Sequence, residues 1–456
     1  MRSPLDKFSL KKFRKCLYEP DFDKSICGVM PTAFELLGLS IPAMMARYSF
    51  SKFIEGKTAI SKNILNISDS PRHIVNILID SWGVGTLSSN LESDFDKLFF
   101  SLNGFLISSV FPTITSSAVA SWHMGLPPSE HGLLGHKIFF EEIGTVVDTL
   151  NLRTVTGQGG RDSLVRVGLR PKKWLWSPPL YNELEKSDVL HIELLSRELA
   201  RTGLSHFLHS NKTSSFVIGC NDLVDIFATA RELIVRINKR KKLLMNIYLG
   251  EFDWLVHKFG PQSPEGAEGL KHIIDALKWF LFSLPEPLLR ETVLSLSADH
   301  GQVDTTQMPP VSFSRTQQEF LIQEMLRTIP GRSGRLTHFY VKPGKKADLI
   351  AYLEKVVDTR GVIIPVDEVH SLLNVNTVSD QIRSRVGDIL VLLDPGTQFA
   401  FEPKGEESGV SSEIEEDLSD FPMKGSHGSL SFQELVVPCI ISLGTLMKEE
   451  LLSQHM

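Results

Sequence analysis

The sequence predicts an α/β fold built on a mostly parallel central sheet. Three short segments rich in apolar and β-branched residues lead to this prediction: 73–79 (HIVNILI), 243–249 (LLMNIYL) and 291–297 (ETVLSLS). Such segments are typical of strands that are buried on both faces, as in a parallel sheet. An aspartate follows each segment within four residues. Because open α/β sheets bind ligands beyond the carboxyl ends of their strands, these three ends are the first candidates for a functional site.

Composition places the chain among ordinary globular proteins. Its 456 residues are 42% hydrophobic and 22% charged, enough for one large α/β domain or two to three smaller units. The net charge of −6 gives no electrostatic reason to expect a nucleic acid as partner. The four cysteines are scattered without CxxC spacing, which favours reduced thiols in an intracellular protein over a disulfide framework or a thiolate zinc site. They are Cys16, Cys27, Cys220 and Cys439.

Neither a membrane span nor a secretory signal is visible in the sequence. No apolar run approaches the ~20 residues that a membrane helix needs. The first 21 residues are basic and mixed and lack the apolar stretch of a secretory signal. These features predict a soluble, cytoplasmic protein with no membrane partner, and they leave the oligomeric state open.

The domain organisation follows from changes in character along the chain. Residues 1–70 show no clean period, and we expect them to pack on the main domain, which we assign to 71–331 and 425–456. Between these two parts, 332–424 is expected to form a small inserted α/β subdomain that shapes the substrate pocket. Residues 402–420 are acidic and rich in serine and glycine, which predicts a mobile loop.

Hydrophobic periodicity predicts the other elements. In the main domain we expect a helix over 187–200, a strand over 215–219, helices over 222–240 and 266–284, and a strand over 435–441. In the insert we expect a strand over 337–342, a helix over 346–359 and strands at 363–364 and 387–393.

The first candidate ligand is Asp80, which leaves a buried strand into the glycine-bearing loop 81–85 (SWGVG). A carboxylate at the tip of a buried strand is well placed to bind a ligand. The structural alternative is an aspartate that only caps the next element.

A cluster of hydroxyl groups in 111–117 (FPTITSS) precedes the apolar residues 118–120, which predicts a loop entering a helix near Thr115. Free N–H groups and the helix dipole favour anions at such a helix start, so these hydroxyls are well placed for phosphoryl chemistry. The alternative is that they serve as N-caps.

Three more motifs carry aspartate or histidine near the ends of expected strands. Asp253 and His257 are four residues apart, which puts both on one face of a helical turn. Asp299 and His300 precede a glycine, and His427 lies in Gly-Ser-His-Gly. Each motif also has a structural explanation, such as a surface ion pair, a turn cap or a buried histidine.

Together these motifs supply three carboxylates and three imidazoles, a mixed set suited to zinc or manganese. Two divalent ions would exceed the charge of three carboxylates by one unit, and this excess would attract a phosphate. Six ligands suffice for two open sites about 4 Å apart, which clamp the attacking and leaving oxygens of an in-line displacement. A threonine hydroxyl bound to one ion would lose its proton near neutral pH and become a nucleophile.

Taken together, these motifs resemble those of the alkaline phosphatase superfamily, and most of all its type I phosphodiesterase/nucleotide pyrophosphatase branch. The segment 111–132 is similar to that branch's run of nucleophile, helix and Gly-Leu-x-Pro-x-x-His-Gly. The resemblance implies a three-layer sandwich with a mostly parallel sheet. The matching positions are Asp80, Thr115, Asp253, His257, Asp299, His300 and His427.

The resemblance also implies roles for these residues. Thr115 would be the nucleophile, forming a phosphothreonine intermediate during hydrolysis of a phosphodiester or nucleotide pyrophosphate. Two successive inversions would retain the configuration at phosphorus. Zinc is the commonest metal, with manganese as the alternative. One ion would be held by Asp80, Asp299, His300 and Thr115, and the other by Asp253, His257 and His427.

The sequence departs from the family at two points. The branch commonly has an asparagine twenty-one residues after the nucleophile, where it binds a phosphoryl oxygen, and this chain has His136 there. A histidine can donate one hydrogen bond in the same role, so we assign His136 to substrate binding. Ser116 and Ser117 stand where Phe-Pro is frequent.

Other functions within the superfamily remain alternatives: a phosphomonoesterase, a phosphonate hydrolase or a cofactor-independent phosphosugar mutase. The Cys-x-Pro-x-Arg signature of sulfatases is absent. An inactive binding module would lack a ligand or the nucleophile, and none is missing here.

Overall fold

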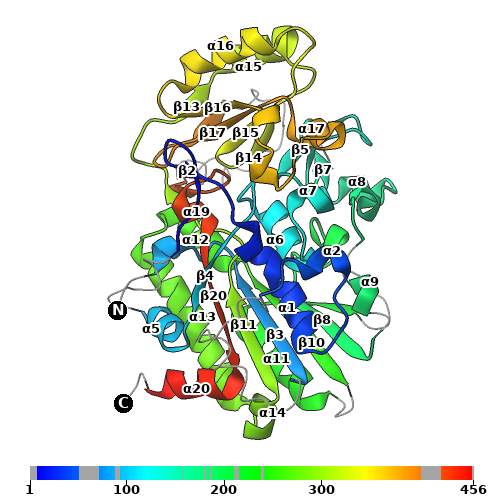
Figure 1. The fold of residues 1–456 in the computed structure, drawn as a ribbon, viewed down its shortest axis with the longest axis vertical. Helices are drawn as coiled ribbons and strands as arrows, with labels where there is room; N and C mark the ends of the chain where they lie inside the picture. The colour runs from blue at the N-terminus through cyan, green and yellow to red at the C-terminus, as the bar shows by residue number, and fades with distance from the viewer. Residues whose placement is uncertain are drawn as a thin grey trace.

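The computed structural model describes residues 8–50, 71–87, 93–157, 159–178, 181–184, 187–209, 215–237, 241–401 and 423–453. Its core is a seven-stranded sheet with the order β4-β20-β11-β3-β10-β8-β9 (Figure 1). The last five strands are parallel, and β20 runs antiparallel to both β11 and β4. The strands are β4 (Phe105–Ser108), β20 (Val436–Leu443), β11 (Thr292–Ser297), β3 (His73–Ile79), β10 (Lys242–Leu249), β8 (Val189–Ser196) and β9 (Ser215–Cys220).

Helices cover both faces of this sheet, so the predicted three-layer α/β sandwich is confirmed (Figure 1). One layer is formed around α6, which contacts α1, α7 and α10. The other layer is formed around α13, which contacts α5, α11, α12 and α20. The helices are α1 (Val29–Leu36), α5 (Asp94–Ser101), α6 (Thr115–Met124), α7 (Pro128–His131), α10 (Ser205–Leu208), α11 (Leu223–Arg236), α12 (Glu251–Phe259), α13 (Pro264–Ser283) and α20 (Gly444–Ser453).

Most expected elements of the main domain lie where the periodicity put them, but the helix expected over 187–200 is wrong. Residues 189–196 form β8, which pairs with β10 on one side and β9 on the other. Two polar side chains on β8, those of His191 and Glu193, interrupt the apolar pattern that is typical of a buried strand. The carboxylate of Glu193 accepts a hydrogen bond from Asn246 Nδ2 at 2.9 Å, so the neighbouring strand satisfies a group that would otherwise be costly to bury.

The N-terminal part packs against the main core. The hairpin of β1 (Lys12–Arg14) and β2 (Leu17–Tyr18) bonds to the rest of the chain through Tyr18 N and Leu430 O at 2.9 Å. Phe34 of α1 is buried in the same hydrophobic cluster as the central strands. The helix α2 (Ala43–Ala46) follows.

A second seven-stranded sheet, antiparallel throughout, lies at the upper end of the molecule in Figure 1 and has the order β16-β17-β15-β14-β5-β6-β7. The expected insert 332–424 supplies β15, β16 and β17, whereas β5, β6 and β7 come from residues 137–154. The expected acidic loop 402–420 lies outside the described residues. The strands are β5 (Lys137–Phe140), β6 (Thr145–Asp148), β7 (Arg153–Thr154), β14 (Gly331–Ser333), β15 (Leu336–Phe339), β16 (Gly361–Pro365) and β17 (Ile389–Leu393).

This second sheet has its own small hydrophobic core, which includes Leu349 and Leu353 of α16. In two short two-stranded sheets, β12 pairs with β19 and β13 pairs with β18. The remaining elements include β12 (Val303–Asp304), β13 (Val311–Phe313), β18 (Phe399–Phe401), β19 (Gly425–Ser426), α8 (Ser163–Arg166), α9 (Tyr181–Leu184), α14 (Glu286–Arg290), α15 (Arg315–Phe320), α16 (Lys346–Val357), α17 (Asp380–Val386) and α19 (Phe432–Leu435).

All four cysteines are free thiols, and three of them are buried. None of the helices in the described part of the chain combines the length and the apolar character that a bilayer crossing requires.

Candidate active site

The carboxyl ends of three neighbouring strands bring the predicted aspartates together. In the register of the sheet, Leu78 of β3 lies opposite Ser297 of β11, and Ile79 lies opposite Leu249 of β10. The chain then leaves β3 at Asp80, and α12 begins two residues after β10 ends. Gly301 is required after the Asp-His pair, because a Cβ at this position would lie 2.1 Å from the backbone oxygen of Gln433.

Asp80, Asp299 and His300 form the first group of potential metal ligands, with one ligand atom of each within 4.8 Å of the others. Nε2 of His300 lies 3.7 Å from Oδ1 of Asp80 and 3.3 Å from Oδ2 of Asp299. These two carboxylate oxygens are buried and have no hydrogen-bond partner among the described residues. Buried oxygens without a partner are costly unless a cation binds them, so this group fits a divalent ion.

Asp253, His257 and His427 form the second group. Oδ1 of Asp253 lies 3.5 Å from Nε2 of His257 and 3.8 Å from Nε2 of His427. The two imidazole nitrogens are 3.1 Å apart. A tetrahedral ion with ligand bonds of about 2.0–2.1 Å separates its ligand atoms by about 3.4 Å, so these three atoms have the spacing of one face of such a site.

Hydrogen bonds to the backbone fix the orientation of both histidines in the second group. Nδ1 of His257 lies 2.8 Å from the carbonyl oxygen of Gly425, and Nδ1 of His427 lies 2.8 Å from that of Thr113. A carbonyl only accepts, so each Nδ1 carries a proton, and the Nε2 atoms of the two rings point toward each other. Two lone pairs facing each other repel unless a cation lies between them, and this is how metal-binding imidazoles are commonly held.

Thr115, at the start of α6, contacts the first group. Its Oγ1 lies 3.2 Å from Nε2 of His300, and the ring of His300 stacks on that of His427 with centroids 3.8 Å apart. The N-cap of α6 is Ile114, and Thr115 is the first helical residue. Its hydroxyl is therefore not the helix cap that the sequence left as the alternative, and it lies at the positive end of a ten-residue helix.

Crowded carboxylates give the first group an unusual protonation in the absence of a cation. Burial, together with repulsion from Asp253, raises the pKa of Asp299 to about 7. Burial and the same kind of repulsion raise the pKa of Asp80 well above its ordinary value. Burial lowers the pKa of His300 to about 4, so its ring is neutral and able to act as a ligand at neutral pH. The group thus takes up protons where a metal ion would otherwise supply positive charge.

The carboxylate of the second group has a lowered pKa instead of a raised one, because imidazoles lie beside it. Burial alone would raise the pKa of Asp253, but the neighbouring imidazoles of His257 and His427 outweigh burial and lower the pKa to about 2. Burial lowers the pKa of His427 well below its ordinary value. An ionised carboxylate and a neutral imidazole are the forms that bind a metal ion.

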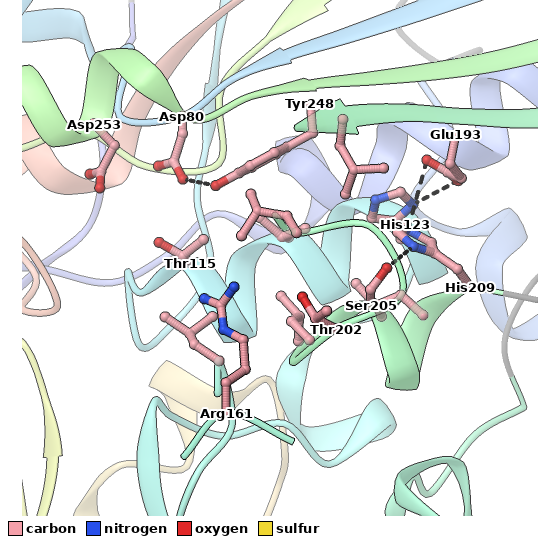
Figure 2. A pocket seen from close by; sticks show the side chains of 16 residues that line it. Asp80, Thr115, His123, Arg161, Glu193, Thr202, Ser205, His209, Tyr248 and Asp253 are labelled. Atoms are coloured by element: carbon pink, nitrogen blue, oxygen red, sulfur yellow. Dashed lines mark hydrogen bonds and ion pairs between the residues drawn. The ribbon is translucent and has the colours of Figure 1, made fainter. Parts of the chain in front are cut away.

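A cavity of about 190 Å³ opens beside the first residue of α6 (Figure 2). Thr115, Asp80 and Asp253 line one end of it. Leucine side chains form much of its wall, namely Leu150, Leu195, Leu199, Leu204 and Leu208.

Comparison with protein families agrees with this geometry. The family model described as type I phosphodiesterase / nucleotide pyrophosphatase matches residues 74–430. The chain belongs to this family. Members of the family are phosphoester hydrolases of the alkaline phosphatase superfamily, which uses divalent metal ions. Comparison with curated protein sequences found no significant match.

Solved structures share the fold of this phosphodiesterase family member at low sequence identity. Phosphonoacetate hydrolase from Sinorhizobium meliloti, in complex with phosphonoformate, is 15% identical with a TM-score of 0.55, covering 84% of this chain and 96% of its own. Murine ectonucleotide pyrophosphatase/phosphodiesterase 5 is 13% identical with a TM-score of 0.57, covering 80% and 87%. An inactive variant of the murine protein, in complex with AMP, is 13% identical with a TM-score of 0.55, covering 83% and 94%.

The residues that hold the candidate ligands in place were not predicted from the sequence of this phosphodiesterase family member. Ser81 donates from Oγ to Oδ1 of Asp253 at 2.5 Å and from its backbone N to Oδ1 of Asp299 at 3.1 Å. Gln302 donates from Nε2 to Oδ1 of Asp253 at 2.7 Å. Tyr248 donates to Oδ2 of Asp80 (Figure 2). Both Ser81 and Gln302 lie within two residues of a predicted ligand, and that proximity is the signal that could have found them.

The predicted substrate-binding residue, His136, lies apart from the two groups. Its Nε2 is 3.0 Å from Oδ1 of Asp148 on β6. Its backbone N donates to Ser333 Oγ of β14 at 3.0 Å. His136 therefore precedes β5 and contacts the second sheet, and it is not among the residues that line the cavity beside Thr115. Its substrate-binding role stays a prediction.

Proposed function

We propose that this protein hydrolyses a phosphodiester or a nucleotide pyrophosphate with Thr115 as nucleophile and two divalent ions as cofactors. The observation that carries the proposal is that six ligand-type side chains form two groups of three, and that the Thr115 hydroxyl lies 3.2 Å from His300, whose ring stacks on His427 of the other group. We assign one ion to Asp80, Asp299, His300 and Thr115, and the other to Asp253, His257 and His427. We expect zinc, with manganese as the alternative.

When bound, the ions would lower the pKa of the Thr115 hydroxyl and offset the negative charge on the phosphoryl oxygens. The first step forms a bond from Thr115 Oγ1 to phosphorus and breaks the bond from phosphorus to the leaving oxygen. The hydroxyl proton passes to solvent. The N–H groups in the first turn of α6 favour the anionic phosphoryl group beside Thr115.

In the second step a water molecule attacks phosphorus and breaks its bond to Thr115 Oγ1. This releases the phosphate product and restores the hydroxyl. Two in-line displacements at one phosphorus retain its configuration. His136 would donate a hydrogen bond to a phosphoryl oxygen in the substrate complex.

The cavity beside Thr115 favours a compact leaving group. Its volume of about 190 Å³ is below the ~300–1,000 Å³ of common small-molecule sites. The leucine wall suits an apolar or aromatic moiety. A phosphonate hydrolase is the second candidate function, because phosphonate substrates are small. We also propose that the enzyme is cytoplasmic. We propose domain boundaries at 71–331 with 425–456 for the catalytic domain and 332–424 for an insert that shapes the pocket.

The test compares hydrolysis of bis(p-nitrophenyl) phosphate with that of p-nitrophenyl phosphate. The metal-free full-length protein is assayed after addition of zinc or manganese. We expect faster hydrolysis of the diester, full dependence on added metal, and loss of at least about 10³-fold in Thr115→Ala, as for removal of a nucleophile. A preference for the monoester would contradict the phosphodiesterase assignment.

Ser116→Ala is the matched control, because it removes a hydroxyl from the same end of the helix. This hydroxyl is buried and has no hydrogen-bond partner in the described part of the chain. Its activity should stay within a few-fold of wild type. Acid quenching during turnover, followed by peptide mass spectrometry, should find the phosphoryl group on Thr115. Equal rates for wild type and Thr115→Ala would refute the mechanism.

A further inference from the structure

A second cluster of ligand-type side chains lies at the other end of the same cavity. Figure 2 shows His123, Glu193 and His209 gathered opposite Thr115. They come from α6, from β8 and from the residue after α10, so the tertiary fold alone brings them together. All three are buried, with 9%, 4% and 9% of their surfaces exposed.

The spacing of this cluster is that of a metal site. One ligand atom from each residue lies within 4.8 Å of the other two. Nδ1 of His123 is 3.4 Å from Oε1 of Glu193, and Nε2 of His209 is 3.8 Å from Oε2. A tetrahedral ion separates its ligand atoms by about 3.4 Å, and here, as in the second group of the active site, a carboxylate and two imidazoles have nearly that spacing.

One ring nitrogen in this cluster has no partner. The side chain of His209 is more than nine-tenths buried. Its Nε2 nevertheless makes no hydrogen bond within the described residues. The other nitrogen, Nδ1, is 2.5 Å from Oγ of Ser205. This contact holds the ring so that the unpartnered nitrogen points toward the carboxylate (Figure 2). Outer contacts of this kind orient metal-binding histidines.

The carboxylate of Glu193 is held from the opposite side. Oε1 accepts from Nε2 of His191 at 2.7 Å and from Nδ2 of Asn246 at 2.9 Å. Asn246 in turn accepts from Nδ2 of Asn76 at 3.0 Å. This chain of hydrogen bonds crosses three strands and leaves Oε2 on the side of His209. These hydrogen bonds satisfy Oε1, and a cation bound at Oε2 would offset the charge of the buried carboxylate.

We propose that His123, Glu193 and His209 form a third divalent-metal site, separate from the two-metal centre at Thr115. Two imidazoles and one carboxylate are a ligand set for zinc, iron(II) or manganese. All three residues line the cavity that Thr115 also lines, so a molecule in this cavity could reach an ion bound by them. An ion there would contact the part of a bound molecule that is furthest from the reacting phosphorus.

The test counts bound ions and needs no activity assay. Metal-free full-length protein is titrated with Co²⁺, the visible absorption of the protein-bound ion is recorded, and the ions retained after desalting are measured by mass spectrometry. We expect His209→Gln and Glu193→Gln each to retain one ion fewer than wild type. His206→Gln is the matched control, because it removes a neighbouring imidazole that faces Asp162 instead of the cluster, and it should bind as many ions as wild type.

The same titration in Asp80→Asn/Asp253→Asn separates this site from the proposed function. This variant impairs both groups of the main centre, so a remaining ion that disappears on adding His209→Gln supports the third site even if the phosphodiesterase proposal fails. Circular dichroism confirms folding, and His123→Gln replaces any variant that does not fold. An unchanged number of ions in His209→Gln, Glu193→Gln and His123→Gln would overturn the proposal.

Discussion

The hydroxyl of Tyr248 donates a hydrogen bond to Oδ2 of Asp80 across two neighbouring parallel strands. Burial and the nearby carboxylate raise the pKa of Tyr248 well above its ordinary value, so the hydroxyl keeps its proton and acts as a donor. Oδ1 of the same carboxylate remains without a partner among the described residues. One oxygen of Asp80 is thus held by the protein while the other is available to a metal ion.

We therefore expect Tyr248→Phe to weaken metal binding at the group that contains Asp80 by about 10–100-fold, the usual effect of losing an outer hydrogen bond to a ligand. The measurement is activity as a function of free zinc or manganese. Tyr340→Phe is the control, because that hydroxyl, just after β15, donates to the carbonyl of Arg385 in α17 at 2.8 Å. The same metal dependence in both variants would contradict the role of Tyr248.

Metal binding should become weaker as the pH falls from 8 to 6. The pKa of Asp299 is raised to about 7 in the metal-free protein, so below this pH a bound proton must leave before an ion can bind. Calorimetric titration with zinc in buffers of different ionisation enthalpy should detect proton release at pH 6 and less of it at pH 8. An affinity that does not change with pH would contradict this prediction.

The carboxyl group of Asp299 also makes the stability of the metal-free protein depend on pH. Its pKa rises on folding from 3.8 to about 7. A raised pKa favours the folded state fully below the unfolded value, and this contribution is lost as the pH rises through 7. Buried histidines such as His300, whose pKa is lowered to about 4, change stability in the opposite direction, so the test compares two proteins. Between pH 4 and 7, the free energy of unfolding of chelator-treated Asp299→Asn should rise relative to that of wild type, measured by urea denaturation. The same pH dependence in both proteins would assign the effect to other groups.

Arg335 and Glu434 form an ion pair in which neither side chain is exposed, with Nη1 2.6 Å from Oε2. The backbone N of Arg335 also donates to the carbonyl of His427 at 2.8 Å, so the pair supports the loop that carries this predicted ligand. Arg335→Met leaves the buried carboxylate without its counter-ion. We expect the free energy of unfolding to fall by about 3–5 kcal/mol, measured by urea denaturation.

The exposed pair of Lys271 and Glu268 provides the comparison, because these side chains are 62% and 55% exposed. Lys271→Met should change the free energy of unfolding by less than about 1 kcal/mol. Replacing both buried partners, in Arg335→Met/Glu434→Leu, should recover part of the loss. A loss in Arg335→Met no larger than that in Lys271→Met would show that the pair is not important for stability.

The predicted role of His136 can be tested by replacing it with asparagine, the residue that this branch commonly has at that position. If it donates a hydrogen bond to a phosphoryl oxygen, His136→Ala should lower kcat/KM for the diester by about tenfold, whereas His136→Asn should retain most of it. The contact of His136 with Asp148 complicates the comparison, so Asp148→Asn is measured in parallel. If all three variants match wild type, His136 has no part in substrate binding.

The class of fold and the identity of six candidate ligands could be predicted from the sequence because both depend on local patterns. An apolar run such as 73–79 defines a buried strand wherever it lies, and an aspartate at its end is at the ligand-binding edge of the sheet. The pairing of Asp253 with His257 follows from helical spacing alone, and the two lie 3.5 Å apart.

Local patterns failed where distant strands decide the outcome. Residues 189–196 carry His191 and Glu193, which obscure the apolar run of a buried strand, and the segment was expected to be helical. In the fold, Asn246 on the neighbouring strand satisfies the carboxylate at 2.9 Å, and no periodicity within the segment could reveal that partner.

Short segments of the sequence thus predict an α/β sheet with candidate metal ligands at its carboxyl edge, because strand burial and residue type are properties of such segments. Which candidate ligands form a group depends on the tertiary structure. So does the position of Thr115, which lines one cavity with Asp80 and Asp253, and the meeting of His123, Glu193 and His209 at the far end of that cavity. Those relationships depend on distances between segments that are remote in the chain, and these distances are set by strand order and by the packing of helices on the sheet.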